Sequence, residues 1–348
     1  GDDEETIKKA YRTLVKKYHP DRYVNMFEAF TPMVPCNPLY AEACLNFGED
    51  GSFQGFKLDE DGLLHDEWNV YFKPMENQPG YFPVHDEKHT VCNDICEWRN
   101  QVVPPRDISE DKDAWSAAIA MAKTVDRNEK FLTASVRPGV FERLHFLHDI
   151  EDTMCDLYDE PEAMQELIDC IVEYEMQTAK AVCEFVKPDA VFHHDDWGTQ
   201  ISTFLSPSMF EEFIVPAYKK IYGYYKDHGV QLIIHHTDSF GETLVPYMIE
   251  VGIDIWQGVL SASNDIPKLI ETYGGQITFM GGIENAHIDK PEWTEEEVRA
   301  EVNRALDYVN SKFYFIPGMT AGDAESGYPG VYEAVTKCID ERSERDFA

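Results

Sequence analysis

The sequence has few basic residues for its size. Its 348 residues contain 30 Lys and Arg against 65 Asp and Glu, which gives a net charge of −35 at pH 7. Binding to nucleic acid or to an anionic membrane surface depends on clustered cations, so this balance argues against both kinds of partner. The one basic cluster lies in residues 5–17, where the apolar spacing predicts an amphipathic helix.

Long apolar runs and paired cysteines are also absent. No run of about 18 apolar residues is present and no signal-peptide pattern opens the chain, so we expect a cytoplasmic protein without a transmembrane helix. The eight cysteines are scattered and form no CxxC pair, which predicts reduced thiols. Hydrophobic residues make up 43% of the chain, enough for a sizeable core.

The second part of the chain alternates between apolar runs and helical segments. The runs typical of buried strands are 131–136, 190–194, 231–236, 253–258, 277–282 and 313–318. The helical segments are 160–186, 207–227, 241–251, 264–273, 294–310 and 329–345. Such alternation predicts a parallel α/β sheet. No GxGxxG or GxxxxGK[ST] loop is present, which argues against an open doubly wound sheet.

We therefore predict a (β/α)8 TIM barrel with an N-terminal helical and hairpin elaboration. One or two further barrel strands are expected from residues 27–34 and from a hairpin within residues 55–74, which has an Asp-Gly turn. Residues 1–105 form the elaboration, including the first barrel strand or strands. Residues 106–348 form the main part of the barrel, and the whole is a single domain.

Polar side chains follow the ends of several predicted strands. They are His193 to Trp197, His235 to Asp238, Trp256 and Gln257, Glu284, and Asp323 and Glu325. Functional residues of a parallel barrel gather at these strand ends. Neighbouring side chains on a strand point to opposite faces, so one histidine of each tandem pair is expected inside the barrel and the other against the helices.

The spacing His236-x-Asp238 predicts a pair of metal ligands, because imidazole and carboxylate both suit zinc or another divalent cation. A third ligand is expected from Glu284, Asp323 or Glu325. Without a metal, the same groups can serve as general acid and hydrogen-bond donors.

Four stretches of the sequence resemble the uroporphyrinogen decarboxylase superfamily, and most closely its corrinoid-dependent methyltransferase branch. They are residues 139–169, 189–221, 231–259 and 277–302. The resemblance implies a (β/α)8 barrel whose central funnel accepts the substrate. The Arg-Gln-Ala-Gly-Arg loop with which the decarboxylases bind propionate groups is absent.

The zinc methyltransferases of that branch carry His-x-Cys where this sequence has His236 and Asp238, and their second cysteine has no counterpart here. A thiolate-bound zinc activates a thiol acceptor, so these departures put a thiol-alkylating role in doubt. The resemblance then implies O-demethylation, in which a methyl group passes from a small methoxylated or methylated donor to the cobalamin of a separate corrinoid protein.

For this reaction the candidate residues fall into two groups. The catalytic candidates are His236, Asp238, Asp196 and Glu284. The substrate-binding candidates are His194, Trp197, Trp256, Gln257, Phe204 and Tyr328. Two alternatives stay open: a decarboxylase of a small carboxylic acid or porphyrinogen-like substrate, for which Arg137 is the obvious cation, and a non-catalytic small-molecule-binding paralogue. The oligomeric state is also open.

Overall fold

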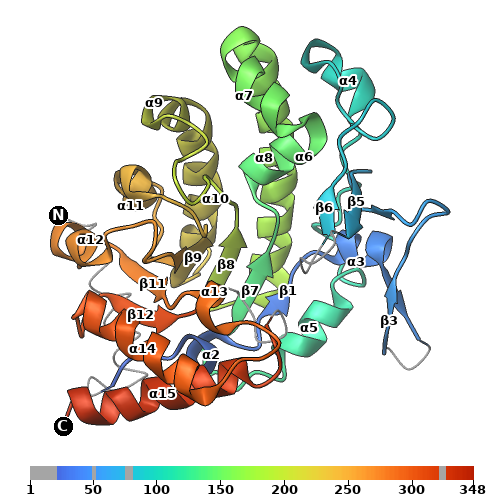
Figure 1. Ribbon diagram of the computed structural model, residues 1–348. Helices are drawn as coiled ribbons and strands as arrows, with labels where there is room; N and C mark the ends of the chain where they lie inside the picture. Colours follow the sequence, from blue (N-terminus) through green and yellow to red (C-terminus); the bar gives the residue numbers. More distant parts are fainter. Residues whose placement is uncertain (1–21, 49–51, 75–80, 321–326) are drawn as a thin grey trace.

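The computed structural model describes residues 22–48, 52–74, 81–320 and 327–348, so the predicted helix over 5–17 lies outside the described residues. Its centre is a seven-stranded parallel sheet of order β1-β7-β8-β9-β10-β11-β12 (Figure 1). The strands are β1 (Val34–Pro35), β7 (Thr133–Val136), β8 (Ala190–His194), β9 (Leu232–His236), β10 (Ile255–Val259), β11 (Thr278–Gly282) and β12 (Phe315–Gly318). Each of the six predicted apolar runs therefore forms a strand.

Helices cover the outside of this sheet. They include α5 (Ser116–Ala122), α6 (Val140–His148), α7 (Ile150–Asp159), α8 (Pro161–Ala181), α10 (Val215–Asp227), α11 (Val245–Glu250), α12 (Ile266–Tyr273), α14 (Glu295–Val309) and α15 (Val331–Asp346). The strand–helix alternation is that of a TIM-type α/β barrel, as predicted. None of the described helices is both long and apolar enough to cross a membrane. All eight cysteines are free thiols, as expected.

The sheet curls around the short helix α2 (Met26–Phe30). Inward-facing residues of β8 to β12 form one apolar cluster with α2, and the Phe30 ring stacks on Phe131 with centroids 5.5 Å apart. The prediction of a strand over 27–34 is wrong for most of that range. Met26, Ala29 and Phe30 are all buried, and this spacing places them on one face of a helix. Only β1 follows, so the barrel sheet has seven strands among the described residues rather than eight.

The N-terminal region adds two small antiparallel sheets beside the barrel (Figure 1). One pairs β2 (Leu45–Phe47) with β3 (Phe53–Phe56), and the other joins β4 (Leu64–His65), β5 (Tyr71–Pro74) and β6 (Tyr81–Pro83). The predicted hairpin is present: Leu58 pairs antiparallel with Leu64 across a turn in which Gly62 has φ 80°. These strands do not extend the barrel sheet, contrary to the expectation that the hairpin region supplies a barrel strand.

Candidate functional site

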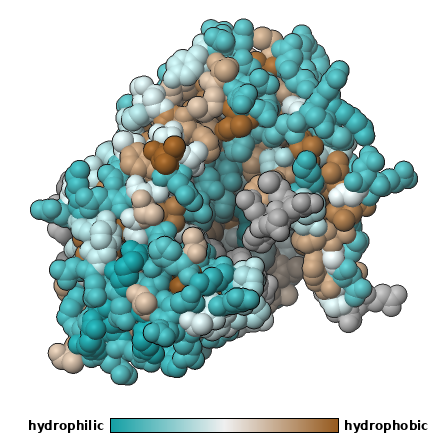
Figure 2. Space-filling view, viewed as in Figure 1, coloured by the Kyte–Doolittle hydropathy of each residue, from teal (hydrophilic) through white to brown (hydrophobic). Residues whose placement is uncertain are grey.

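Three side chains meet at the carboxyl ends of two neighbouring strands. His194 ends β8, Asp196 follows it, and His236 ends β9. The ligand atoms of these three residues all lie within 4.8 Å of one another. Figure 2 shows that this face of the molecule is hollowed at its centre, where Figure 1 places the ends of β7 and β8.

The two histidines present their rings face to face. Their centroids are 4.4 Å apart with 20° between the planes. The Nδ1 atom of His194 lies 2.8 Å from Glu142 Oε2, and that of His236 contacts Gln257 Oε1. The Nε2 atoms are therefore left to face the site, and Nε2 of His236 lies 4.0 Å from Asp196 Oδ1.

Gln257 determines which nitrogen of His236 carries the proton. Its amide nitrogen donates to the backbone carbonyls of Met319 and Thr320 at 3.1 and 3.0 Å. Its Oε1 atom therefore faces His236 and accepts from Nδ1–H. The Nε2 atom of His236 is left with its lone pair directed to the site, which is the form that binds a metal.

Burial and the neighbouring imidazole lower the pKa of His236, and burial also lowers the pKa of His194. Both rings are consequently neutral near pH 7. Burial and the nearby Asp196 carboxylate raise the pKa of Glu142 well above its usual range, so the group beside His194 holds a proton more readily than an exposed glutamate does.

Asp238 is not one of the three residues whose ligand atoms lie within 4.8 Å of one another. Its backbone N–H donates to Asp196 Oδ1 at 3.1 Å, while its side chain reaches solvent. The surrounding protein and the Asp196 carboxylate raise the pKa of Asp238 to about 6. His236 is thus grouped with His194 and Asp196 rather than with Asp238, because the register of two strands, and not spacing along one loop, brings the ligand atoms together.

Asp195 holds the start of α6 against the site. Its carboxylate accepts from the backbone N–H groups of Phe141 and Glu142 at 3.1 and 2.7 Å. It also accepts from the Tyr218 hydroxyl at 2.5 Å and the Trp197 indole at 2.8 Å. Burial and Glu142 raise the pKa of Asp195 to about 7, while the bonds from the Tyr218 hydroxyl, the Glu142 N–H and the Trp197 indole act in the opposite direction. Asp195 thereby fixes Glu142 beside His194.

The two predicted tryptophans lie outside the barrel interior. Gln257 points inward, so its strand neighbour Trp256 points outward, where it is fully buried and donates to the Thr237 carbonyl at 2.9 Å. Trp197 stacks on His235 with centroids 3.8 Å apart, in the same outer layer. Neither side chain is placed to line the funnel.

Three further candidates are described by contacts outside the three-residue group. Phe204 packs against Phe141. Tyr328 is 43% exposed. Glu284 accepts from Ser261 Oγ at 2.6 Å and Ala262 N at 2.9 Å, so its carboxylate stabilises a loop.

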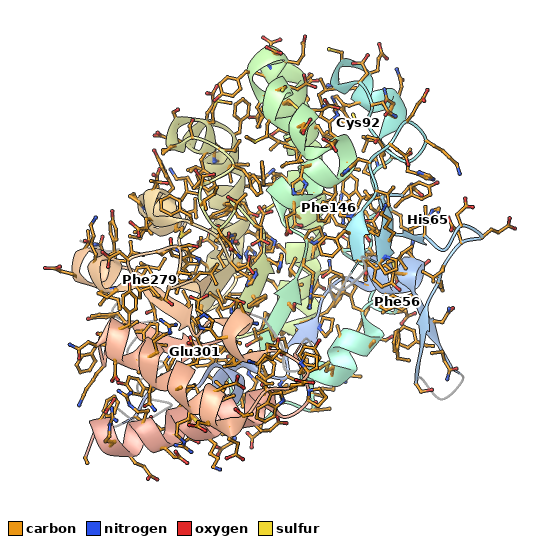
Figure 3. All side chains as sticks on the ribbon, viewed as in Figure 1. Phe56, His65, Cys92, Phe146, Phe279 and Glu301 are labelled. Carbon is orange, nitrogen blue, oxygen red and sulfur yellow. The ribbon has the colours of Figure 1, made fainter. Side chains whose placement is uncertain are left out.

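The backbone of Glu284 is held in turn by Glu301 of α14, which Figure 3 labels. Asp323 and Glu325 lie outside the described residues.

Glu142 is a site residue that the sequence analysis missed. It lies near the start of α6, a helix that follows β7 and therefore begins at the same end of the barrel as the tandem histidines. The sequence signal that could have identified Glu142 is an acidic residue in the first helical turn after a predicted strand, because this turn lies at the functional end of a parallel barrel.

The family model described as Uroporphyrinogen decarboxylase (URO-D) matches residues 142–321. Among solved structures, a methyltransferase from Methanosarcina mazei aligns with TM-score 0.58 at 14% identity, covering 79% of this chain and 76% of that one. The structure of D-psicose 3-epimerase in the presence of D-fructose aligns at 14% identity over 64% of this chain and 81% of that one. Its TM-score of 0.36 is below the level that indicates a shared fold. No curated protein matches the chain.

Proposed function

Because the chain belongs to the uroporphyrinogen decarboxylase family, we propose that it is a methyltransferase that moves a methyl group from a small methoxylated compound to a corrinoid protein. The structural likeness to a methyltransferase supports this reaction class over decarboxylation. The observation that carries the proposal is the group of His194, Asp196 and His236 at the mouth of the barrel.

These three residues fit a divalent cation. Two neutral imidazoles and a carboxylate form a nitrogen and oxygen donor set suited to zinc and similar ions. Each imidazole also has its second nitrogen held by a polar partner, as metal-binding histidines usually do. A bound cation would act as a Lewis acid toward an ether oxygen. The three ligands include no thiolate, and this favours an oxygen-bound methyl group over a thiol as the reacting partner.

The residues of the chain then have separable tasks. Glu142 and Gln257 orient the two imidazoles, and Asp196 adds negative charge to the site. Asp238 reaches solvent at the same mouth, and a carboxyl group with a pKa of about 6 can deliver a proton near neutral pH.

In the proposed transfer one bond breaks and one bond forms. The carbon–oxygen bond of the ether breaks and its electron pair stays on oxygen, which takes a proton from Asp238 or from water. The methyl group goes to the reduced cobalt of the partner protein, which supplies the electron pair for the new bond.

Demethylation of a panel of methoxyarenes, in the presence of a reduced corrinoid protein, tests the proposal. We expect phenol release and methylcobalamin formation by the wild-type protein, with methylamines and betaines as the comparison donors. His236→Ala and Asp196→Ala should abolish turnover, whereas Glu284→Gln should retain it. Release of labelled carbon dioxide from a carboxylic acid, with no methyl transfer, would establish the decarboxylase instead.

A further inference from the structure

A row of buried polar side chains lies directly behind the site, between the sheet and helices α8 and α10. His193 and His235 are the outward-facing neighbours of the two site histidines, as the alternation along each strand predicts. Tyr222 of α10 and Glu175 of α8 complete the row. Both histidines and the tyrosine are 0% exposed. The proposed reaction uses none of these four residues.

Tyr222 connects the two strands through its hydroxyl group. Its oxygen lies 2.9 Å from His193 Nδ1 and 2.7 Å from His235 Nδ1. His193 belongs to β8 and His235 to β9, and the two residues are paired in the strand register. One hydroxyl group on a helix therefore joins the outer faces of the same two strands whose inner faces carry the site.

The acceptors fix the direction of these hydrogen bonds. His235 Nε2 lies 3.2 Å from the backbone carbonyl of Asp195, which can only accept, so this nitrogen carries a proton. In a neutral ring Nδ1 is then an acceptor, so Tyr222 donates to it. The hydroxyl oxygen in turn accepts from His193 Nδ1–H, and His193 Nε2 faces Glu175 Oε2 at 3.3 Å.

We infer that Tyr222 is a positioning residue, whose hydroxyl group joins β8 to β9 so that His194 and His236 keep their face-to-face arrangement. Each outer histidine shares a peptide bond with an inner one, so a displaced outer ring moves its neighbour. The bond from His235 also reaches the backbone of Asp195, which lies between His194 and Asp196. Removal of the hydroxyl leaves two buried imidazole nitrogens without a partner, and the strand ends must move to satisfy them.

The same helix offers a matched control. Tyr225 is also 0% exposed, and its hydroxyl group has no hydrogen-bond partner among the described residues. Tyr222→Phe and Tyr225→Phe therefore delete the same atom from two buried positions of the same helix. Only the first deletion breaks a connection between the two strands.

The test compares the two variants by nitrogen-15 NMR of histidine-labelled protein and by zinc affinity in competition with a chromophoric chelator. We expect Tyr222→Phe to shift the ring signals of His194 and His236 and to lower zinc affinity about 10-fold, the lower end of what loss of a direct partner of a metal ligand costs. Tyr225→Phe should leave both readings at wild-type values. Wild-type ring signals and zinc affinity in Tyr222→Phe would overturn the inference.

The inference rests on the proposed metal site, so the design also separates a failure of that site from a failure of the inference. Should the wild-type protein bind no zinc, the metal assignment fails, and the ring signals alone decide whether Tyr222 positions the histidines. Should Tyr222→Phe fail to fold, His235→Gln replaces it. Glutamine keeps an N–H donor for the Asp195 carbonyl but lacks the ring Nδ1 atom that accepts from Tyr222, so the same signal shifts are expected and their absence counts against the inference.

Discussion

The imidazole rings of His194 and His236 lie face to face, with centroids 4.4 Å apart, because the two residues are paired across neighbouring parallel strands. The backbone hydrogen bonds of the sheet, rather than a loop, therefore set their separation. Each ring is further held at Nδ1 by its own partner, Glu142 or Gln257. A site built in this way is rigid before any ligand arrives, which favours tight and selective binding.

Loss of Asp196 should weaken metal binding far more than loss of Asp238. Asp196 belongs to the three-residue group, whereas Asp238 contributes a backbone N–H to it. We expect Asp196→Ala to lower zinc affinity by more than the roughly 10–100-fold that a lost outer contact costs. Asp238→Asn should stay near wild type. Chelator competition measures both, and equal losses would favour the sequence-based pairing of His236 with Asp238.

Gln257 offers a test of ring orientation. Gln257→Met removes the acceptor for His236 Nδ1 and the two donors to the carbonyls of Met319 and Thr320. The ring is then free to take its other tautomer, and zinc affinity should fall about 10–100-fold. Gln257→Glu keeps the acceptor and should lose less affinity than Gln257→Met. Titration with zinc gives the ranking, and a reversed order would show that the carbonyl contacts, not the tautomer, matter.

Periodicity along the chain was enough to predict the barrel strands, since a buried parallel strand appears as a short apolar run. It was not enough for α2, because five residues with apolar positions at i, i+3 and i+4 fit either a strand or one helical turn. Helices α6 and α7 were also missed, since no helical segment was predicted between residues 137 and 159. They meet at Asp149, which adopts φ 73°, a break that apolar spacing does not reveal.

The site was only partly predictable for a related reason. The alternation of side chains correctly assigned one histidine of each pair to the barrel and one to the helices. The same rule, applied to Trp256 beside Gln257, would have placed that tryptophan outside. The partner of His236 could not be found from spacing, because Asp238 is its neighbour in sequence whereas His194 is its neighbour across the sheet.

The raised pKa of Asp238 gives a stability change with a defined sign. A carboxyl group whose pKa rises from 3.8 to about 6 on folding binds more protons in the folded state between these values. The stability it contributes is therefore present at low pH and is lost as pH rises through about 6. In metal-free protein, Asp238→Asn should raise the free energy of unfolding at pH 7.5 by at most about 1 kcal/mol, since the side chain is solvent-exposed.

Below about pH 3 the same substitution should leave stability unchanged, because Asp238 is then mostly protonated in both states. Urea unfolding at the two pH values provides the measurement. A stabilisation of equal size at both values would mean that the carboxylate is not responsible.

Gly139, at the start of α6, should tolerate no side chain. A Cβ atom at this position would lie 2.4 Å from Asp195 Cβ and 2.4 Å from the Tyr218 hydroxyl oxygen. Both neighbours are buried and bonded to each other, so Gly139→Ala should cost about 3 kcal/mol of unfolding free energy. Gly223, inside α10, has nothing within 4 Å of its would-be Cβ, and Gly223→Ala should instead stabilise by up to about 1 kcal/mol. Urea unfolding distinguishes the two, and a stable Gly139→Ala variant would show that Asp195 does not hold α6 as closely as this contact requires.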